Sequence, residues 1–201
     1  MTAGSRKKLP PIPDYLIYEM DDGKPIYYRG YKDVIKGIKT SEEIMGSSIL
    51  QSMVIELIKN VINAQLSKNY IILSNELGLL FSKKSWRLAD IAIFDKKALL
   101  VQGIKDEYSK VPPKIVIEVD TKAHFEQPSD VSYYYHHKTD QLLDFGVERV
   151  IWIYTGSEKF MIAEKDQRWE TANWTEDIEI MPGIVVNIPK LIEEFYQPEE
   201  D

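Results

Sequence analysis

The chain has 201 residues, of which 44% are hydrophobic and 28% are charged, and it contains no cysteine. This is the composition of an ordinary globular domain, and it excludes a disulfide framework and thiolate chemistry. The formal net charge of −7 argues against a protein that coats nucleic acid non-specifically, because that kind of binding needs lysine and arginine to neutralise phosphates. No stretch approaches the roughly 18 apolar residues needed to span a bilayer. We therefore expect a cytoplasmic protein with no membrane partner.

The sequence predicts one domain between two short extensions. Residues 1–13 are rich in proline and basic residues and are expected to form a flexible arm, residues 14–196 form the domain, and residues 197–201 form an acidic tail. Within residues 14–38, a DDGK turn separates two aromatic stretches, which predicts a hairpin or an irregular segment.

A helix is predicted from Thr40 or Ser41 to about Leu66. Thr40 and Glu43 have the spacing of a capping box, and the apolar residues that follow recur at helical spacing. Gly46 and the two serines after it can interrupt this helix.

Three strands are predicted in the middle of the chain, at residues 70–81, 86–95 and 114–121. The third is short and apolar almost throughout, which is typical of a central strand covered on both faces. Strands at residues 158–164 and 168–174 are expected to form a closing antiparallel pair, before a short strand and a one- or two-turn helix at the end of the chain.

A second helix is predicted at residues 130–145, with Ser129 or Asp130 at its start and Gly146 after its end. It connects the preceding strand to a strand at residues 149–155, and this spacing is the length of a βαβ unit. The pattern therefore predicts an α/β fold, with a mixed central sheet flanked by helices.

Acidic residues stand at positions in two of these strands where a buried apolar residue would be expected. Asp90 lies in the run from Leu88 to Phe94, which is otherwise apolar. Glu118 and Asp120 lie two positions apart in the next strand, so their side chains should share one face. An uncompensated buried carboxylate is very costly, so these acids need a cation, a basic residue or solvent. If the two strands pair, Asp90 and Glu118 converge.

The helix at residues 130–145 supplies a lysine to this candidate site. Lys138 is seven residues after Val131 and seven before Phe145, which places it on the inward-facing apolar stripe. It therefore needs a carboxylate partner or a functional role, unless its aliphatic side chain extends far enough for the ammonium group to reach solvent. Lys122, near the end of the third strand, is the alternative candidate for the lysine of this site.

A single acid in a strand is more often at a sheet edge, or paired with a basic residue, than a metal ligand. The combination of Asp90, Glu118 and a suitably placed lysine favours a functional site, because buried ionisable groups gather at such sites. The three histidines lack the spacing of a zinc site, and no phosphate-binding loop is present, so a nucleotide-binding domain is a remote alternative.

The order and spacing of these segments resemble the Uma2-type family of candidate restriction endonucleases, also known as domain of unknown function 820, in the PD-(D/E)xK nuclease superfamily. The residues that carry the resemblance are RLADIAIF, PPKIVIEV, the K-x7-G of Lys138 and Gly146, and VERVIWIY. It runs from about Tyr15 to Phe195 and includes the DDGK turn and the closing MPGIVVNIPKLI. The resemblance implies a restriction-endonuclease-like fold for residues 14–196.

The resemblance also implies roles for individual residues. Asp90 and Glu118 match the acids of the family's two acidic motifs, and Lys138 matches a lysine that lies on the helix rather than on the strand. Mg²⁺ or Mn²⁺ on the two carboxylates, with the backbone carbonyl of Val119 as a further ligand, would neutralise a scissile phosphate and activate a water. Lys138 would orient that water or stabilise the phosphorane.

Departures from the family pattern leave two functions open. Ala89 stands where the family usually has proline, Asp120 occupies the superfamily's usual lysine position, and no histidine occurs from Ser47 to Gln51. Asp120 could instead hold a second metal or accept a hydrogen bond from Lys122. The first function is a metal-dependent endonuclease acting on DNA, for which the resemblance allows a homodimer. The alternative is a catalytically inactive nuclease-fold module for binding or interaction.

Overall fold

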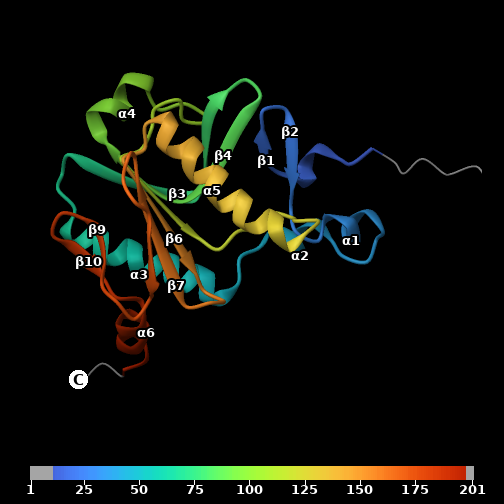
Figure 1. The fold of residues 1–201 in the computed structure, drawn as a ribbon. Coiled ribbons are helices and arrows are strands. Elements are labelled where there is room, and N and C mark those ends of the chain that lie inside the picture. Colours follow the sequence, from blue (N-terminus) through green and yellow to red (C-terminus); the bar gives the residue numbers. More distant parts are fainter. Residues whose placement is uncertain (1–10, 198–201) are drawn as a thin grey trace, which may run out of the picture.

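Residues 11–197 are described by the structure, which is a computed structural model. Most of the predicted arm at residues 1–13 and of the predicted tail at residues 197–201 lies outside this range. Within it, strands from both halves of the chain build one mixed sheet, with long helices on its two faces (Figure 1). None of the helices in residues 11–197 combines the length and the apolar character that crossing a bilayer requires.

Eight strands form the sheet, in the order β2-β1-β4-β5-β6-β7-β8, and β3 pairs with β4 outside this path. Strands β5 and β6 run parallel and the other neighbours are antiparallel, so the predicted mixed central sheet is confirmed. A separate small sheet contains two further strands. The strands are β1 (Ile17–Asp21), β2 (Lys24–Tyr27), β3 (Tyr70–Ser82), β4 (Ser85–Asp95), β5 (Ile115–Val119), β6 (Arg149–Tyr154), β7 (Lys159–Glu164), β8 (Glu170–Asn173), β9 (Ile178–Met181) and β10 (Ile184–Val186).

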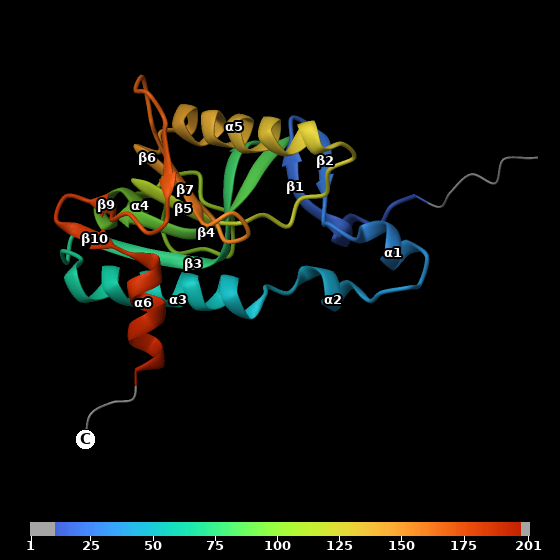
Figure 2. The same ribbon diagram turned by 60° about the horizontal axis from the view of Figure 1, so that its bottom comes forward.

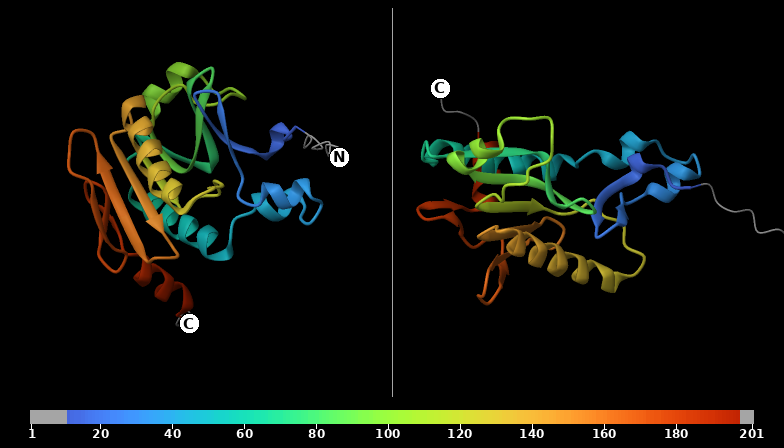
Figure 3. Two further views of the ribbon diagram at one scale, coloured as in Figure 1. Left: turned by 45° about the vertical axis from the view of Figure 1, so that its right-hand side comes forward. Right: turned by 90° about the horizontal axis from the view of Figure 1, so that it is seen from above.

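Two long helices cover the sheet, α5 on one face and α3 on the other (Figure 2). The hairpin β1–β2 and the short helices α1 and α2 gather at one end of the molecule, whereas α6 lies with the β9–β10 sheet at the other end (Figure 3). After a single 3-10 turn at Asp14–Leu16, the helices are α1 (Tyr31–Ile35), α2 (Ser41–Met45), α3 (Ile49–Gln65), α4 (Lys96–Gln102), α5 (Pro128–Phe145) and α6 (Ile188–Tyr196).

Most of the predicted elements are confirmed, including the hairpin at the DDGK turn and the interruption of the first helix. Ser48 caps α3 after that interruption, because its side chain accepts a hydrogen bond from Gln51 N. The predicted start of α5 is wrong. Gln127 precedes the helix and Pro128 is its first residue, because the fixed φ of proline suits the first helical turn. Helix α4 and strand β9 have no counterpart among the predicted elements.

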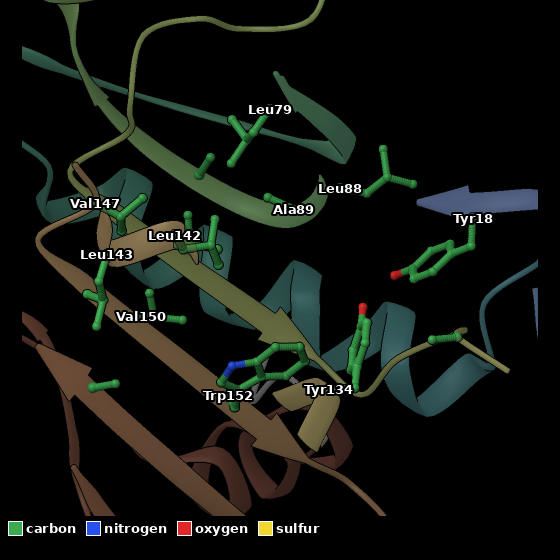
Figure 4. Packing of buried hydrophobic residues seen from close by; sticks show 14 of the residues in the cluster. Tyr18, Leu79, Leu88, Ala89, Tyr134, Leu142, Leu143, Val147, Val150 and Trp152 are labelled. Carbon is green, nitrogen blue, oxygen red and sulfur yellow. The ribbon is translucent and has the colours of Figure 1, made fainter. Parts of the chain in front are cut away.

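Two hydrophobic clusters lie on opposite faces of the sheet. One lies under α5 and includes Tyr134 and Trp152, which Figure 4 shows close together. The other lies between the sheet and α3, and includes Val54 and Ile58 of that helix. Strand β5 is buried on both faces by these clusters, which explains its apolar sequence. Glu118 is the one polar residue in it.

One edge of β4 lacks a neighbouring strand over part of its length. Strand β3 pairs with one edge of β4 along most of its length. The other edge of β4 pairs first with β1, at Trp86, and then with β5, from Ile91 onward. Residues 87–90 therefore have no partner strand on this side. Backbone groups buried there need other hydrogen-bond partners, and the side chains that supply them form the candidate site.

The end of α5 provides a test of the fold. Gly146 follows the helix with a φ of 115°, and a Cβ at this position would lie 3.0 Å from Cγ of Pro112. Gly146→Ala should lower the free energy of unfolding by about 1–2 kcal/mol, the typical cost of a non-glycine residue in the left-handed region. Gly156→Ala is the control, because no atom lies within 4 Å of a Cβ there. Equal urea-unfolding midpoints for the two variants would contradict the structure at this position.

Candidate active site

Asp90 lies at the end of the unpaired stretch of β4. Its Oδ2 accepts a hydrogen bond from Val119 N at 2.8 Å, in place of the backbone bond that a continued β4–β5 ladder would make. The register of that ladder, with Ile91 opposite Ile117, puts Asp90 opposite Glu118. The structure therefore brings the two predicted acids to neighbouring positions, at the point where β4 and β5 separate.

Two side chains bond to the backbone of Leu88 in the same stretch. Leu88 N donates to Oε1 of Glu19 at 3.0 Å, and Nζ of Lys138 donates to Leu88 O at 2.8 Å. These bonds satisfy both polar groups that would otherwise pair with a neighbouring strand. The prediction that Lys138 lies on the inward face of α5 is confirmed, since its side chain is fully buried.

Lys138 lies between two buried carboxylates. Its Nζ is 2.8 Å from Oε1 of Glu19 and 3.0 Å from Oε1 of Glu118. With Leu88 O, these two ion pairs place three protein oxygens around the ammonium group, so it faces the protein and not a water or a phosphate in this arrangement. Burial alone would lower the pKa of Lys138, but the charges of Glu118 and Glu19 outweigh it and hold the pKa above its ordinary value.

Arg87 completes a buried polar network on this face of the sheet. Its Nη1 lies 3.2 Å from Oε2 of Glu19, and its guanidinium also bonds to a glutamine of α5. Tyr134 donates to the same oxygen of Glu19 at 2.8 Å. Two buried acids, Glu19 and Glu118, thus face two buried bases, Arg87 and Lys138, so the four charges balance.

Asp90 forms no ion pair with this network. It is half-buried and lines a cavity of about 400 Å³ together with residues of α3 and β3. Burial raises the pKa of Asp90 to about 6, in spite of the hydrogen bond from Val119. Burial also raises the pKa of Glu118 well above its ordinary value; Lys138 opposes this rise and the charge of Asp90 adds to it. An added cation would therefore stabilise the charged forms of both acids.

Lys122 and Glu76 line the same cavity as Asp90. Lys122 lies in the loop after β5 and forms an ion pair with Glu76, which stands in an irregularity of β3 with a φ of 52°. Of the two lysines that the sequence offered, Lys122 therefore lines the open cavity, and Lys138 contacts Glu118 in the interior.

Asp120 does not share a face with Glu118, contrary to the prediction. Strand β5 ends at Val119, and Asp120 has a φ of 58°, so the alternation of the strand stops before it. The carboxylate of Asp120 accepts hydrogen bonds from N and Oγ1 of Thr155, at 2.9 and 2.6 Å. Asp120 thus fixes the chain after β6, and its carboxylate bonds to Thr155 and not to Lys122, one of the two partners considered for it.

Gln51 is a site residue that was not predicted from the sequence. Its Nε2 donates to Val119 O at 2.7 Å, the carbonyl expected to bind a metal. A carbonyl oxygen has two lone pairs, so this bond leaves one for a ligand. Gln51 lies on the buried stripe of α3 with Val54 and Ile58, so the reasoning that singled out Lys138 on α5 would have found it.

The oxygen donors at this point fit a divalent cation. Oε1 of Glu118 is buried and accepts no aligned hydrogen bond from any group in residues 11–197. The carboxylates of Asp90 and Glu118 and the carbonyl of Val119 are hard oxygen donors, the type that Mg²⁺ prefers. In the described part of the chain, no cluster of three or more acids or histidines is suitably placed, so two carboxylates would be the charged ligands. Mg²⁺ is commonly held in this way, with waters completing its coordination.

The fold is shared with a protein of known structure. The chain is similar to the crystal structure of a candidate nuclease belonging to DUF820 from Anabaena variabilis, with a TM-score of 0.58 and 16% sequence identity. The chain has the fold of that protein. The match covers 87% of this chain and 89% of that one, so the predicted restriction-endonuclease-like fold is confirmed. No protein-family model and no curated protein matches the sequence.

The raised pKa of Asp90 predicts a pH-dependent effect of its replacement. The folded protein holds this pKa at about 6, above the roughly 3.9 of an unfolded aspartate, so the carboxyl costs stability as the pH rises through this range. Asp90→Asn keeps an oxygen for Val119 N and carries no charge. Without metal ions, it should stabilise the protein by about 3 kcal/mol near pH 8 and have little effect near pH 4, by urea unfolding.

The control for this measurement is Asp144→Asn, at an exposed carboxyl, which should change the stability little. A loss of stability in Asp90→Asn at the higher pH would contradict the assignment of Asp90 as an uncompensated acid.

The buried ion pairs of Lys138 predict a large loss of stability on its removal. Lys138→Ala should lower the free energy of unfolding by about 3–5 kcal/mol, because it leaves the buried Glu118 without its charged partner and Glu19 with Arg87 alone. Lys138→Met keeps most of the side-chain volume and separates the lost charge from the lost packing. Lys165→Ala is the control, since Lys165 lies 3.5 Å from an exposed carboxylate and should matter little. A loss below about 1 kcal/mol in both Lys138 variants would rule out the buried pairs.

Proposed function

We propose that the protein is a metal-dependent endonuclease that hydrolyses phosphodiester bonds in DNA. The observation that carries this proposal is the position of Asp90 and Glu118, side by side where β4 and β5 separate, in a fold shared with a candidate nuclease. Burial disfavours the charged forms of these two adjacent acids, one of which lines a cavity, so a bound cation would stabilise them.

Asp90, Glu118 and the carbonyl of Val119 would hold Mg²⁺ or Mn²⁺. The bound ion supplies charge neutralisation at the phosphate and lowers the pKa of a bound water. The protein's own part is to fix these oxygens before the substrate binds. Val119 N holds the carboxylate of Asp90 and Lys138 holds that of Glu118.

Two lysines are available to contact the phosphate. Lys138 is the one that the resemblance implies, but its ammonium group already has one hydrogen bond and two ion pairs to protein oxygens. Lys122 lines the cavity beside Asp90, where a phosphate would enter. We therefore assign Lys138 to positioning Glu118, and Lys122 to the phosphate.

A catalytically inactive binding module with the nuclease fold is the second candidate. The balance of charges around Lys138 favours it, because the buried acids and bases neutralise one another without a metal. Asp120, in the superfamily's usual lysine position, also favours it, because its carboxylate is bonded to Thr155 instead. Such a protein would keep a binding surface and lack hydrolysis.

Cleavage of supercoiled plasmid DNA separates the two candidates. The wild-type protein should nick or linearise the plasmid with Mg²⁺ or Mn²⁺, and EDTA should stop the reaction. Asp90→Asn and Glu118→Gln should each slow cleavage by at least about a hundredfold, because each removes a charged metal ligand. Asp144→Asn, at the exposed carboxyl, should cleave at the wild-type rate.

The lysine assignment is tested in the same assay, together with thermal melts in the presence and absence of Mg²⁺. Lys122→Ala should lose cleavage and keep the metal-dependent rise in melting temperature, because an ammonium group is not a ligand. Cleavage that survives Lys122→Ala and fails in a folded Lys138→Met variant would give the phosphate role to Lys138. No cleavage and no metal-dependent melting shift in the wild type would reject the nuclease and leave the binding module.

A further inference from the structure

We infer that the basic segment from Lys24 to Lys39, together with the loop after β5, binds the phosphate backbone of DNA next to the cavity of Asp90. This surface, which rests on the proposed function, would hold the strand that flanks the cleaved bond. Apart from Lys122 in that loop, its residues lie outside the group of acids and lysines that would carry the chemistry.

Positive charge is concentrated in this segment of an otherwise acidic chain. The 16 residues from Lys24 to Lys39 contain four lysines and one arginine against a single acid, Asp33, and so carry a net charge of +4. Since the whole chain carries −7, the other residues together carry −11. DNA phosphates are repelled by most of the protein and attracted to this segment, which favours one docking site over diffuse binding.

Four of the five basic side chains of the segment line one cavity. A cavity of about 580 Å³ has basic residues on its walls, with two acids among them: Arg29, Lys32, Lys36, Lys39, His124, Asp33 and Glu43. Lys32 forms an ion pair with an acid of the loop after β5 at 2.7 Å. Lys36 and Lys39 are exposed and form no ion pair with any residue in the range 11–197. These two lysines are therefore available to phosphates.

The basic cavity adjoins the cavity that contains Asp90. Helix α2 contributes to both, with Ile44 facing the basic cavity and Met45 facing the other. The loop after β5 does the same, with His124 in the basic cavity and Lys122 in the other. Figure 2 shows α2 between α1 and the start of α3. A strand whose phosphate lies beside Asp90 would therefore continue across the basic cavity.

The basic segment is also fixed to the site by direct contacts. Nη2 of Arg29 donates to Thr121 O at 2.8 Å, and Arg29 N donates to Lys122 O at 2.6 Å. A Cβ on Gly30 would lie 2.9 Å from Cγ2 of Ile44, so α1 and α2 pack closely together. The lysines in and just after α1 are thus presented at a defined position relative to the site, which a surface that sets the path of a strand needs.

A DNA-binding measurement tests this surface. The full-length protein is titrated against a short fluorescent DNA duplex in EDTA, and affinity is followed by anisotropy over a series of salt concentrations. Lys36→Ala/Lys39→Ala should weaken binding about tenfold or more and reduce the salt slope by about 2, because each phosphate contact contributes about 0.9 to that slope. Lys68→Ala/Lys97→Ala removes two exposed lysines elsewhere on the molecule, and should bind as the wild type does.

Each outcome bears on the surface and on the nuclease separately. Equal affinity for the wild type and the Lys36/Lys39 variant, an equal loss in the control variant, or no binding by the wild type would overturn the surface. Binding that depends on these lysines, without plasmid cleavage, would keep the surface and reject the nuclease. Cleavage with unchanged kcat/KM in the Lys36/Lys39 variant would keep the nuclease and overturn the surface. Tighter binding to an RNA of matching sequence would overturn DNA as the partner.

Discussion

The edge of β4 that no strand covers determines the composition of the interior around it. Leu88 presents a buried N–H and a buried C=O there, and leaving either without a partner would cost about 1–3 kcal/mol. Glu19 and Lys138 supply the missing hydrogen bonds, and each brings a charge. Those charges require Arg87 and Glu118 in turn. In most protein interiors, apolar side chains stabilise the fold at least as well as a buried ion pair does. Charged residues are needed here because the backbone of β4 requires hydrogen bonds that apolar side chains cannot make.

Periodicity in the sequence was sufficient to predict the sheet, the long helices and three residues of the candidate site. Asp90 and Glu118 each interrupt an apolar run, and Lys138 lies on an apolar stripe, so a local pattern marks all three. Glu19 and Arg87 give no such signal. Glu19 stands in a short stretch of mixed residues, and Arg87 stands near the start of its strand, where a solvated arginine would be ordinary. The two lie 68 residues apart, so only the tertiary structure reveals that they pair.

The ends of elements were the least predictable parts of the fold, because their positions depend on backbone conformation. Nothing in the sequence KIVIEVDT marks where alternation stops, yet Asp120 adopts a positive φ and leaves the face of Glu118. The start of α5 depends on which of several adjacent polar residues forms the cap, and Pro128 decides it. Helix α4 has no buried residue, so no apolar stripe predicts it, and its cap, Asp95, belongs to the preceding strand.

The polar network also has a consequence for the order in which the chain acquires its structure. Tyr134 bonds to Glu19 across 115 residues of sequence. On a ribosome, the hairpin β1–β2 is therefore made long before the helix that buries its glutamate. An isolated two-stranded hairpin is at best marginally stable in water, and this one has its buried carboxylate solvated until α5 arrives. The hairpin is synthesised early but is buried only after α5 has been made. Residues 17–27 would therefore stay accessible to a protease for much of the time in which the chain is synthesised.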